Sequence, residues 1–82
     1  MSKRLRTFRI GGLKTTVRLE ERIWQALNEI ASRAGSSLDQ TMVRIEEWRL
    51  RNEPGLSRSA AIRVYVLEHF RARLALSDKP VQ

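Results

Sequence analysis

The sequence predicts a small, mainly α-helical domain with one short β-strand near its N-terminus. Apolar residues recur at helical spacing after residue 19, a stretch of period two precedes them, and two breaker segments divide the helical part. The chain has 82 residues and no cysteine, so neither disulfides nor thiolate-bound metals can stabilise it. A chain of this size buries only about 60 % of its unfolded surface, and self-association is then the usual further source of stability.

Positive charge is concentrated at the N-terminus. The chain carries 16 basic and 9 acidic residues, a formal net charge of +7, and residues 1–18 hold six of the basic residues and no acid. Such a segment favours polyanions, either nucleic acid or an anionic membrane surface. No apolar run approaches the roughly 20 residues that span a bilayer or the about 7–15 of a secretory signal. We therefore expect a cytoplasmic protein without a membrane partner.

The strand is predicted at residues 13–19, where polar and apolar side chains alternate from Lys14 onward. This period is typical of a half-buried strand. Its polar side carries Lys14, Thr16 and Arg18. That side is suited to a nucleic acid, or alternatively to discouraging edge-to-edge aggregation.

Two arrangements are open for residues 1–12. Gly11-Gly12 can form a two-residue turn that pairs residues 7–10 with the predicted strand, giving a hairpin. Alternatively, residues 1–12 form an extended basic arm that Phe8 and Ile10 anchor. In both cases the segment brings cations next to the strand.

Two helices are predicted next. The first runs from Glu20 to Ala34, where apolar residues follow a helical period and Gly35 supplies the C-terminal cap. The second covers residues 38–51 and ends at the Asn-Glu-Pro-Gly breaker 52–55.

A third helix is predicted from residues 57–59 to about residue 76, with residues 77–82 as a tail. Residues 60–67 are apolar nearly all round, which indicates burial on more than one side. In so small a chain, a second copy is the expected cover. The domain is then expected to span residues 13–76.

A single strand also needs a partner, because its backbone donors and acceptors must be satisfied. The same strand of a second copy, paired antiparallel across a two-fold axis, supplies one. The apolar residues of both copies then form a shared dimer core. We expect this core to contain Val17, Leu19, Ile23, Trp24, Leu27, Met42, Ile45, Val64 and Leu67.

The order of strand, helix, tight turn and helix resembles the ribbon-helix-helix family, the dimeric DNA-binding fold of the Arc and methionine repressors. The resemblance rests on Lys-Thr-Thr-Val-Arg-Leu-Glu at 14–20, the helix after it, and Gly-Ser-Ser-Leu at 35–38. It covers residues 13–51, and the third helix resembles a bacterial subfamily with an additional C-terminal helix. It implies an intertwined homodimer whose strands form an intermolecular two-stranded antiparallel ribbon.

In the family this ribbon enters the major groove, which admits two strands and offers guanine acceptors to Arg and Lys. By position, the base-contacting residues would be Lys14, Thr16 and Arg18. The free amides before the second helix would hold a phosphate, and they map to Ser36, Ser37 and Leu38. The basic segment would add phosphate contacts through Lys3, Arg4, Arg6 and Arg9.

A second assignment stays open within the same family. Ser57-Arg58-Ser59 also resembles the start of the family's second helix. Residues 57–75 would then be that helix, residues 38–51 an insertion, and the phosphate clamp would move.

No constellation for catalysis or metal binding is found in the sequence. His69 is the single histidine and is expected to be structural, and Trp24 and Trp48 are expected in the core rather than under DNA bases. No nucleophile elbow, phosphate-binding glycine loop or metal spacing occurs. We expect no enzyme, no cofactor and no metal.

The sequence therefore predicts a prokaryotic homodimer that binds double-stranded DNA specifically and represses transcription. One alternative is an antitoxin whose C-terminal part binds a toxin protein. Another is an interaction or assembly module without specific DNA binding, in which the third helix is the contact surface.

Overall fold

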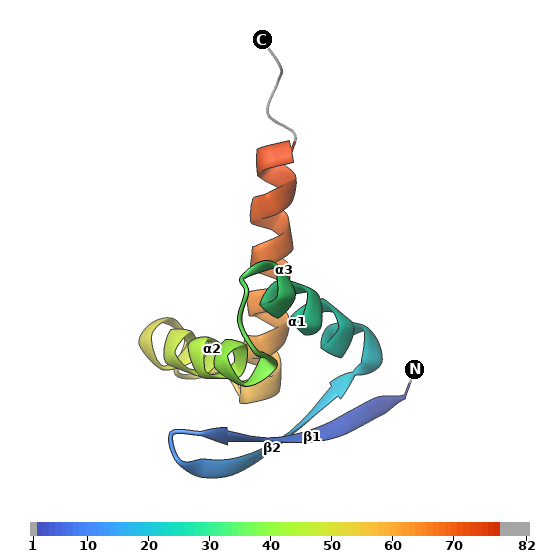
Figure 1. Ribbon diagram of the computed structural model, residues 1–82. Coiled ribbons are helices and arrows are strands. Elements are labelled where there is room, and N and C mark those ends of the chain that lie inside the picture. Colours follow the sequence, from blue (N-terminus) through green and yellow to red (C-terminus); the bar gives the residue numbers. More distant parts are fainter. Residues whose placement is uncertain (1, 78–82) are drawn as a thin grey trace.

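The chain folds into a β-hairpin followed by three helices (Figure 1). In this computed structural model residues 2–77 are described, so residues 78–82 of the expected tail lie outside the described part. The elements are β1 (Lys3–Ile10), β2 (Leu13–Glu20), α1 (Glu21–Arg33), α2 (Leu38–Asn52) and α3 (Arg58–Ser77). The three predicted helices are confirmed, with ends within one or two residues of the expected ones.

Of the two arrangements open for the N-terminal segment, the structure shows the hairpin. β1 pairs antiparallel with β2 along its whole length, from Ile10 opposite Leu13 to Lys3 opposite Glu20. Gly11 and Gly12 have φ values of 61° and 80°, the left-handed conformation that a two-residue hairpin turn requires. The strand predicted at 13–19 thus finds its partner in its own chain, where closing a two-residue loop costs little entropy. Pairing between two copies stays a prediction.

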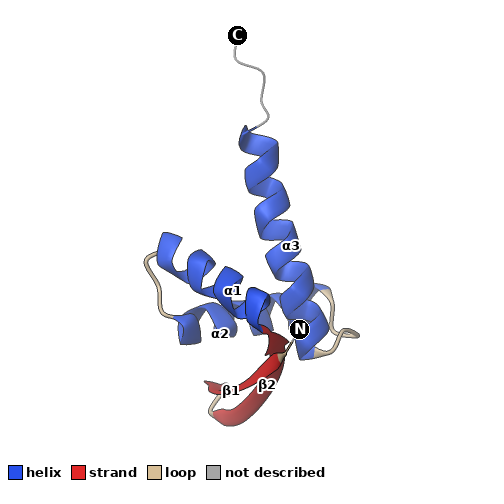
Figure 2. Ribbon diagram, turned by 90° about the vertical axis from the view of Figure 1, so that its right-hand side faces the viewer, coloured by secondary structure: helices blue, strands red, loops and turns tan. Residues whose placement is uncertain are grey.

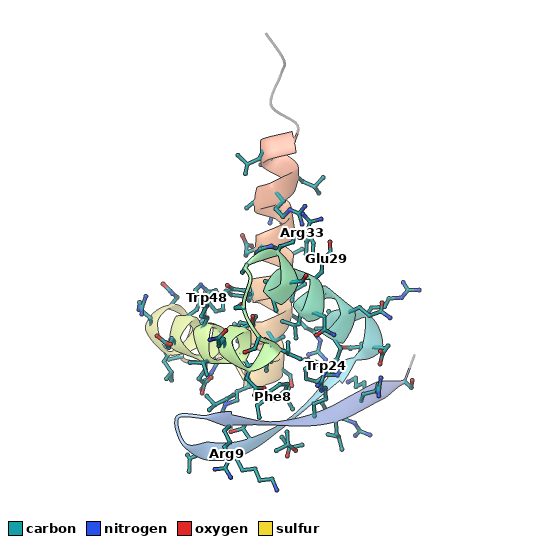
Figure 3. All side chains as sticks on the ribbon, viewed as in Figure 1. Phe8, Arg9, Trp24, Glu29, Arg33 and Trp48 are labelled. Atoms are coloured by element: carbon teal, nitrogen blue, oxygen red, sulfur yellow. The ribbon has the colours of Figure 1, made fainter. Side chains whose placement is uncertain are left out.

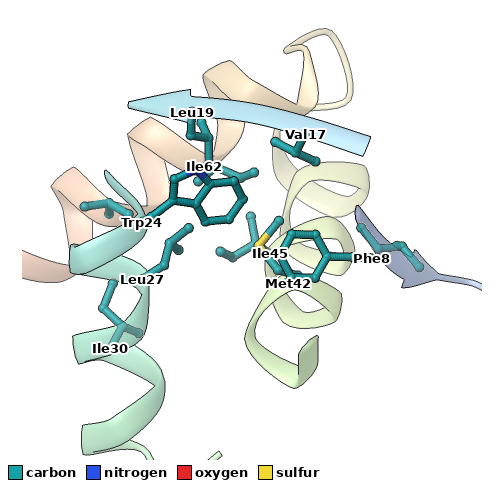
Figure 4. Close-up of a cluster of buried hydrophobic side chains, with 11 residues drawn as sticks. Phe8, Val17, Leu19, Trp24, Leu27, Ile30, Met42, Ile45 and Ile62 are labelled. Atoms are coloured by element: carbon teal, nitrogen blue, oxygen red, sulfur yellow. The ribbon is translucent and has the colours of Figure 1, made fainter. Parts of the chain in front are cut away.

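The strands have one face toward the helices and one face away from them. Phe8, Ile10, Val17 and Leu19 are buried on the helix-facing side. Figure 4 shows Phe8, Val17 and Leu19 beside core residues from all three helices. The buried core consists of Phe8, Ile10, Val17, Leu19, Trp24, Leu27, Ile30, Met42, Ile45, Ile62 and Val66.

α1 and α2 cover this face of the hairpin and are joined by a short turn. α1 ends at Arg33, and Gly35 just beyond it has φ 64°, the left-handed conformation that terminates many helices. α2 begins with a capping box, in which the Gln40 amide donates to Ser37 Oγ at 3.1 Å and the Ser37 amide donates to Gln40 Oε1 at 2.9 Å. The turn is therefore rigidly specified by its own residues.

α3 is buried only in its N-terminal half. Ala61, Ile62 and Val66 lie in the core. The C-terminal half projects from the body of the molecule (Figures 1 and 2). Leu67, Leu74 and Leu76 are 54 %, 61 % and 65 % exposed.

The residues expected in a dimer core are mostly packed within the single chain. Six of the nine are buried there, and Ile23 packs partly buried against them. Val64 is half-buried and Leu67 is exposed, so these two α3 residues remain available to another surface.

Ion pairs connect α3 to the other elements, and the shortest of them involve Glu46 and Glu20. Glu46 of α2 receives Nε–H and Nη–H bonds from Arg49 at 2.7 and 3.0 Å and a bond from Arg58 of α3 at 3.0 Å. These bonds, those of Arg49 first, lower the pKa of Glu46, and Glu46 raises the pKa of Arg49. Arg63 of α3 binds Glu20 through both carboxylate oxygens, at 2.9 and 3.1 Å.

Candidate nucleic-acid interface

The outer face of the hairpin carries the side chains predicted to contact bases. In an antiparallel pair, residues directly opposite each other point to the same face. Lys14 lies opposite Arg9, Thr16 opposite Thr7, and Arg18 opposite Leu5. All six side chains are exposed, whereas the alternate positions Phe8 and Val17 are buried.

Three cations of this face form no salt bridge with another described residue. Among residues 2–77, no salt bridge involves Lys14, Arg18 or Arg9. At the other end of the strands, Lys3 lies opposite Glu20, whose pKa is lowered by a backbone hydrogen bond and by Arg63. Unpaired cations on an exposed ribbon are suited to a polyanion.

The four cations expected to contact phosphates are divided between the two faces. Lys3 and Arg9 are on the outer face with Lys14, and Figure 3 shows Arg9 on the side away from the helices. Arg4 instead forms a 3.1 Å salt bridge from Nη1 to Glu21 Oε2. Arg6 lies over aromatic rings, with its guanidinium carbon 5.5 Å from the Trp24 ring centroid. The sequence alone did not separate these pairs, because it left the hairpin and the arm as alternatives.

The two tryptophans have structural contacts. Trp24 is 3 % exposed, its ring centroid lies 5.7 Å from that of Phe8, and its Nε1–H donates to the Arg4 carbonyl at 3.1 Å. Trp48 is half-buried beside Tyr65, with ring centroids 5.8 Å apart. Trp24 thus anchors β1 on α1, and neither tryptophan lies on the outer face.

The predicted phosphate clamp before α2 is largely satisfied by the chain itself. The Ser36 amide donates to the Ala31 carbonyl at 3.0 Å, and the Ser37 amide donates to Gln40 Oε1. The Leu38 side chain packs against the core. Two of the three expected amides therefore already have acceptors, and a phosphate would have to displace Gln40 to reach that of Ser37.

The start of α3 lies against the ribbon strand. Ser59 Oγ–H donates to the Arg18 carbonyl at 3.5 Å, and Ser57 Oγ caps the helix by accepting from the Ala60 amide at 3.1 Å. The first-turn amides of Arg58 and Ser59 have no acceptor among the described residues, as is usual at a helix N-terminus. This is the segment that the second family assignment singles out.

The remaining polar residues of the described part form no metal-binding cluster. No group of three or more His, Cys, Asp or Glu side chains is close enough to hold a metal within residues 2–77. His69 packs edge-on against Phe70 and its Nε2 is buried without a hydrogen-bond partner, beside an open groove of about 530 Å³. No described helix has the length and apolar character needed to cross a membrane.

Comparison with known proteins assigns the fold to a family. Residues 3–70 match the family model described as a ribbon-helix-helix domain. Among solved structures, the chain is similar to an uncharacterized protein from Bordetella pertussis Tohama I, with 30 % sequence identity and a TM-score of 0.75. The match covers 99 % of this chain, which spans 65 % of the length of the other. No curated protein matches the chain. The chain belongs to the ribbon-helix-helix family.

Proposed function

We propose that the protein is a homodimeric, sequence-specific double-stranded DNA-binding protein that represses transcription, its own gene included. Ribbon-helix-helix domains are DNA-binding or antitoxin-type regulators rather than enzymes. The observation that carries the proposal is the outer face of the hairpin, where Lys14, Thr16 and Arg18 are exposed on a two-stranded ribbon. The protein would require no cofactor.

The ribbon has the right dimensions for the major groove. Strands in a sheet lie about 4.8 Å apart, and the groove is about 12 Å wide. Arg18 and Lys14 can each donate to guanine O6 and N7, while the Thr16 hydroxyl can donate or accept and its methyl group can contact thymine. Contacts of this kind provide sequence discrimination, while contacts to phosphates fix the register.

For the phosphate clamp, the contacts favour the start of α3 over the start of α2. Within the described part of the chain, the first-turn amides of both helices lack acceptors, but the start of α3 also touches the ribbon, through Ser59 Oγ–H and the Arg18 carbonyl. This supports residues 57–75 as the family's second helix.

The dimer would form through the apolar surface that the single chain leaves open. Leu67, Leu74 and Leu76 are exposed on the projecting half of α3, and Val64 is half-buried. A two-fold axis through this surface would give two ribbons and an operator with two half-sites.

The test is binding of the purified protein to its own upstream DNA and to a scrambled duplex, at low and near-physiological salt. A preference for the upstream DNA that survives added salt would support the proposal. Arg18→Ala should abolish this preference, and Arg22→Ala, at an exposed α1 position, is the matched control. Equal, salt-sensitive binding to both duplexes would indicate phosphate contacts alone and lead to a genome-fragment selection. Absence of binding to either duplex and to every genome fragment would favour an assembly module instead.

An antitoxin is the second candidate, because the same exposed leucines on α3 could bind a toxin protein. The oligomeric state distinguishes the two uses of this surface. If Leu67→Lys together with Leu74→Lys converts a dimer into a monomer, the surface belongs to the dimer. If the wild type is already a monomer with these leucines exposed, capture of a toxin is favoured.

A further inference from the structure

We propose that the groove between α2 and α3 binds a small organic cation that carries an aromatic or other apolar group. The groove has a volume of about 530 Å³ and is lined by Trp48, Glu53, Val64, Tyr65, Glu68 and His69. Pockets for small molecules commonly have volumes of about 300–1,000 Å³. None of the lining residues belongs to the hairpin, so the site goes beyond the proposed function.

Two aromatic rings form walls of this groove. Trp48 of α2 and Tyr65 of α3 are inclined at 74°, with ring centroids 5.8 Å apart. Both side chains are half-buried, so their contact holds them in place while part of each stays accessible. In Figure 3, Trp48 lies above α2, whereas the hairpin lies below it. The faces of Trp and Tyr rings attract cations, and aromatic sites of this kind recognise ammonium groups.

The charged side chains of the groove are both acidic. Glu53 and Glu68 belong to the lining, which contains no Lys or Arg although the chain has a net charge of +7. Within residues 2–77 Glu53 forms no salt bridge, and Glu68 has only a 3.8 Å contact with Arg71 between side chains that are 60 % and 69 % exposed. An exposed pair of that length contributes little stability. Both carboxylates can therefore bind the charge of a ligand.

His69 adds an unsatisfied polar atom to the lining. Its ring packs edge-on against Phe70, and its Nε2 is buried without a hydrogen-bond partner in the described part of the chain. Buried polar atoms in folded proteins are nearly always paired. A rotation of the imidazole toward the groove would let a neutral ring nitrogen accept a hydrogen bond from an ammonium N–H.

The helix geometry separates the groove from the exposed leucines of α3. Leu67 is two residues from both Tyr65 and His69, so it lies about 200° around the helix from them. Leu74 follows Leu67 by seven residues, or two turns, and shares its face. A dimer formed through these leucines therefore leaves the groove open, and the acidic lining favours a small cation as its occupant.

Three probes that share a phenylbutyl group test the charge of the ligand. Phenylbutylamine is a cation at pH 7, phenylbutanol is neutral and phenylbutanoate is an anion. Two-dimensional NMR of the full chain reports on the indole N–H groups of Trp48 and Trp24, and the buried Trp24 is the internal reference. We expect the amine to move the Trp48 signal alone, with an affinity about 2- to 30-fold above that of the alcohol, the value of a cation–π contact. The anion should bind more weakly than the alcohol.

Two results of this titration would overturn the proposal. Equal affinities for the amine and the alcohol would mean that the groove is merely apolar. A Trp48 signal that does not move at the solubility limit of the amine would mean that the groove takes no such ligand, including the case in which a second copy covers it.

Substitutions locate the cation, with a matched control on α2. Glu53→Gln removes a lining charge, and we expect it to weaken binding of the amine by about 2- to 5-fold and to leave the alcohol unaffected. Glu47→Gln makes the same change at an exposed α2 position outside the lining and should change neither affinity. Equal losses in the two variants would indicate general attraction to acidic surface and overturn the proposal.

Trp48→Leu tests the aromatic wall. We expect the preference for the amine over the alcohol, measured by isothermal titration calorimetry, to fall toward 1, because the cation–π contact is lost. An unchanged preference would overturn the proposed role of this ring. Circular dichroism would verify the fold, and the exposed Glu53→Gln variant carries the test if Trp48→Leu does not fold.

Discussion

The two strands of the hairpin contain sixteen residues, which alternate between an exposed face and a buried face. Lys14 and Arg18 are exposed on one face, while Val17 and Leu19, at the alternate positions, are 3 % and 0 % exposed on the other. A strand has a period of two, so each neighbouring residue changes face. The contrast shows that stability and recognition are assigned to different residues of one element. Substitutions should therefore affect one property or the other.

The largest expected effect is on the buried face. Leu19→Ala removes a fully buried side chain that packs between the hairpin and the helices, and we expect it to lower the free energy of unfolding by about 2–5 kcal/mol. Urea denaturation followed by circular dichroism would measure this loss. A change below about 1 kcal/mol would mean that the inner face is not the core.

The next effect is on the exposed face. Arg18→Ala should leave the free energy of unfolding within about 0.5 kcal/mol of the wild type, because the side chain is exposed. We expect its ratio of specific to scrambled DNA affinity to fall by about 5- to 150-fold. Fluorescence anisotropy with both duplexes would measure DNA affinity, and the same urea denaturation would measure the free energy of unfolding, so the two properties are determined separately. A large loss of stability would contradict the division of roles between the faces.

A smaller effect is expected at the turn that holds both faces in register. Gly12 has φ 80°, a conformation that costs an L-residue about 1–2 kcal/mol. Gly12→Ala should therefore destabilise the hairpin by about that amount. Gly55→Ala is a matched control, because Gly55 has no positive φ and open space around its Cβ position. Equal unfolding midpoints for the two variants would contradict the turn assignment.

The last and weakest effect concerns acid stability. The pKa of Glu46 is lowered from its ordinary value of 4.5 in the folded chain, chiefly by Arg49. A carboxylate with a lowered folded pKa contributes stability that is present above its unfolded pKa and is lost as the pH falls through the folded value. The free energy of unfolding should therefore decrease as the pH falls from about 5 to 3. Glu46→Gln should reduce this slope, and urea denaturation at several pH values would measure it. An identical slope in the variant would exclude Glu46 as its source.

Periodicity predicted most of the fold and the face on which the candidate site lies. The alternation from Lys14 to Leu19 and the helical spacing up to Ala34 each reflect local backbone geometry, which a sequence carries directly. In β1, Phe8 and Ile10 fit both a paired strand and an anchored arm, because alternation over so few residues does not show which partner a segment has. Local patterns were also unable to separate the outer Arg9 from the inner Arg6.

Three helices, a strand with a cationic side, the breakers between them and the excess of positive charge could all be predicted from the order of residues alone. The pairing of β1 with β2 in the same chain, and the contacts of Arg4 and Arg6 on the helix side, came only from the folded molecule. It is the start of α3, and not that of α2, that contacts the ribbon at Arg18, and this too came only from the folded molecule. The physical reason is that propensity and periodicity act over a few neighbouring residues. Pairing partners and helix docking depend on the burial of side chains that are far apart in the chain.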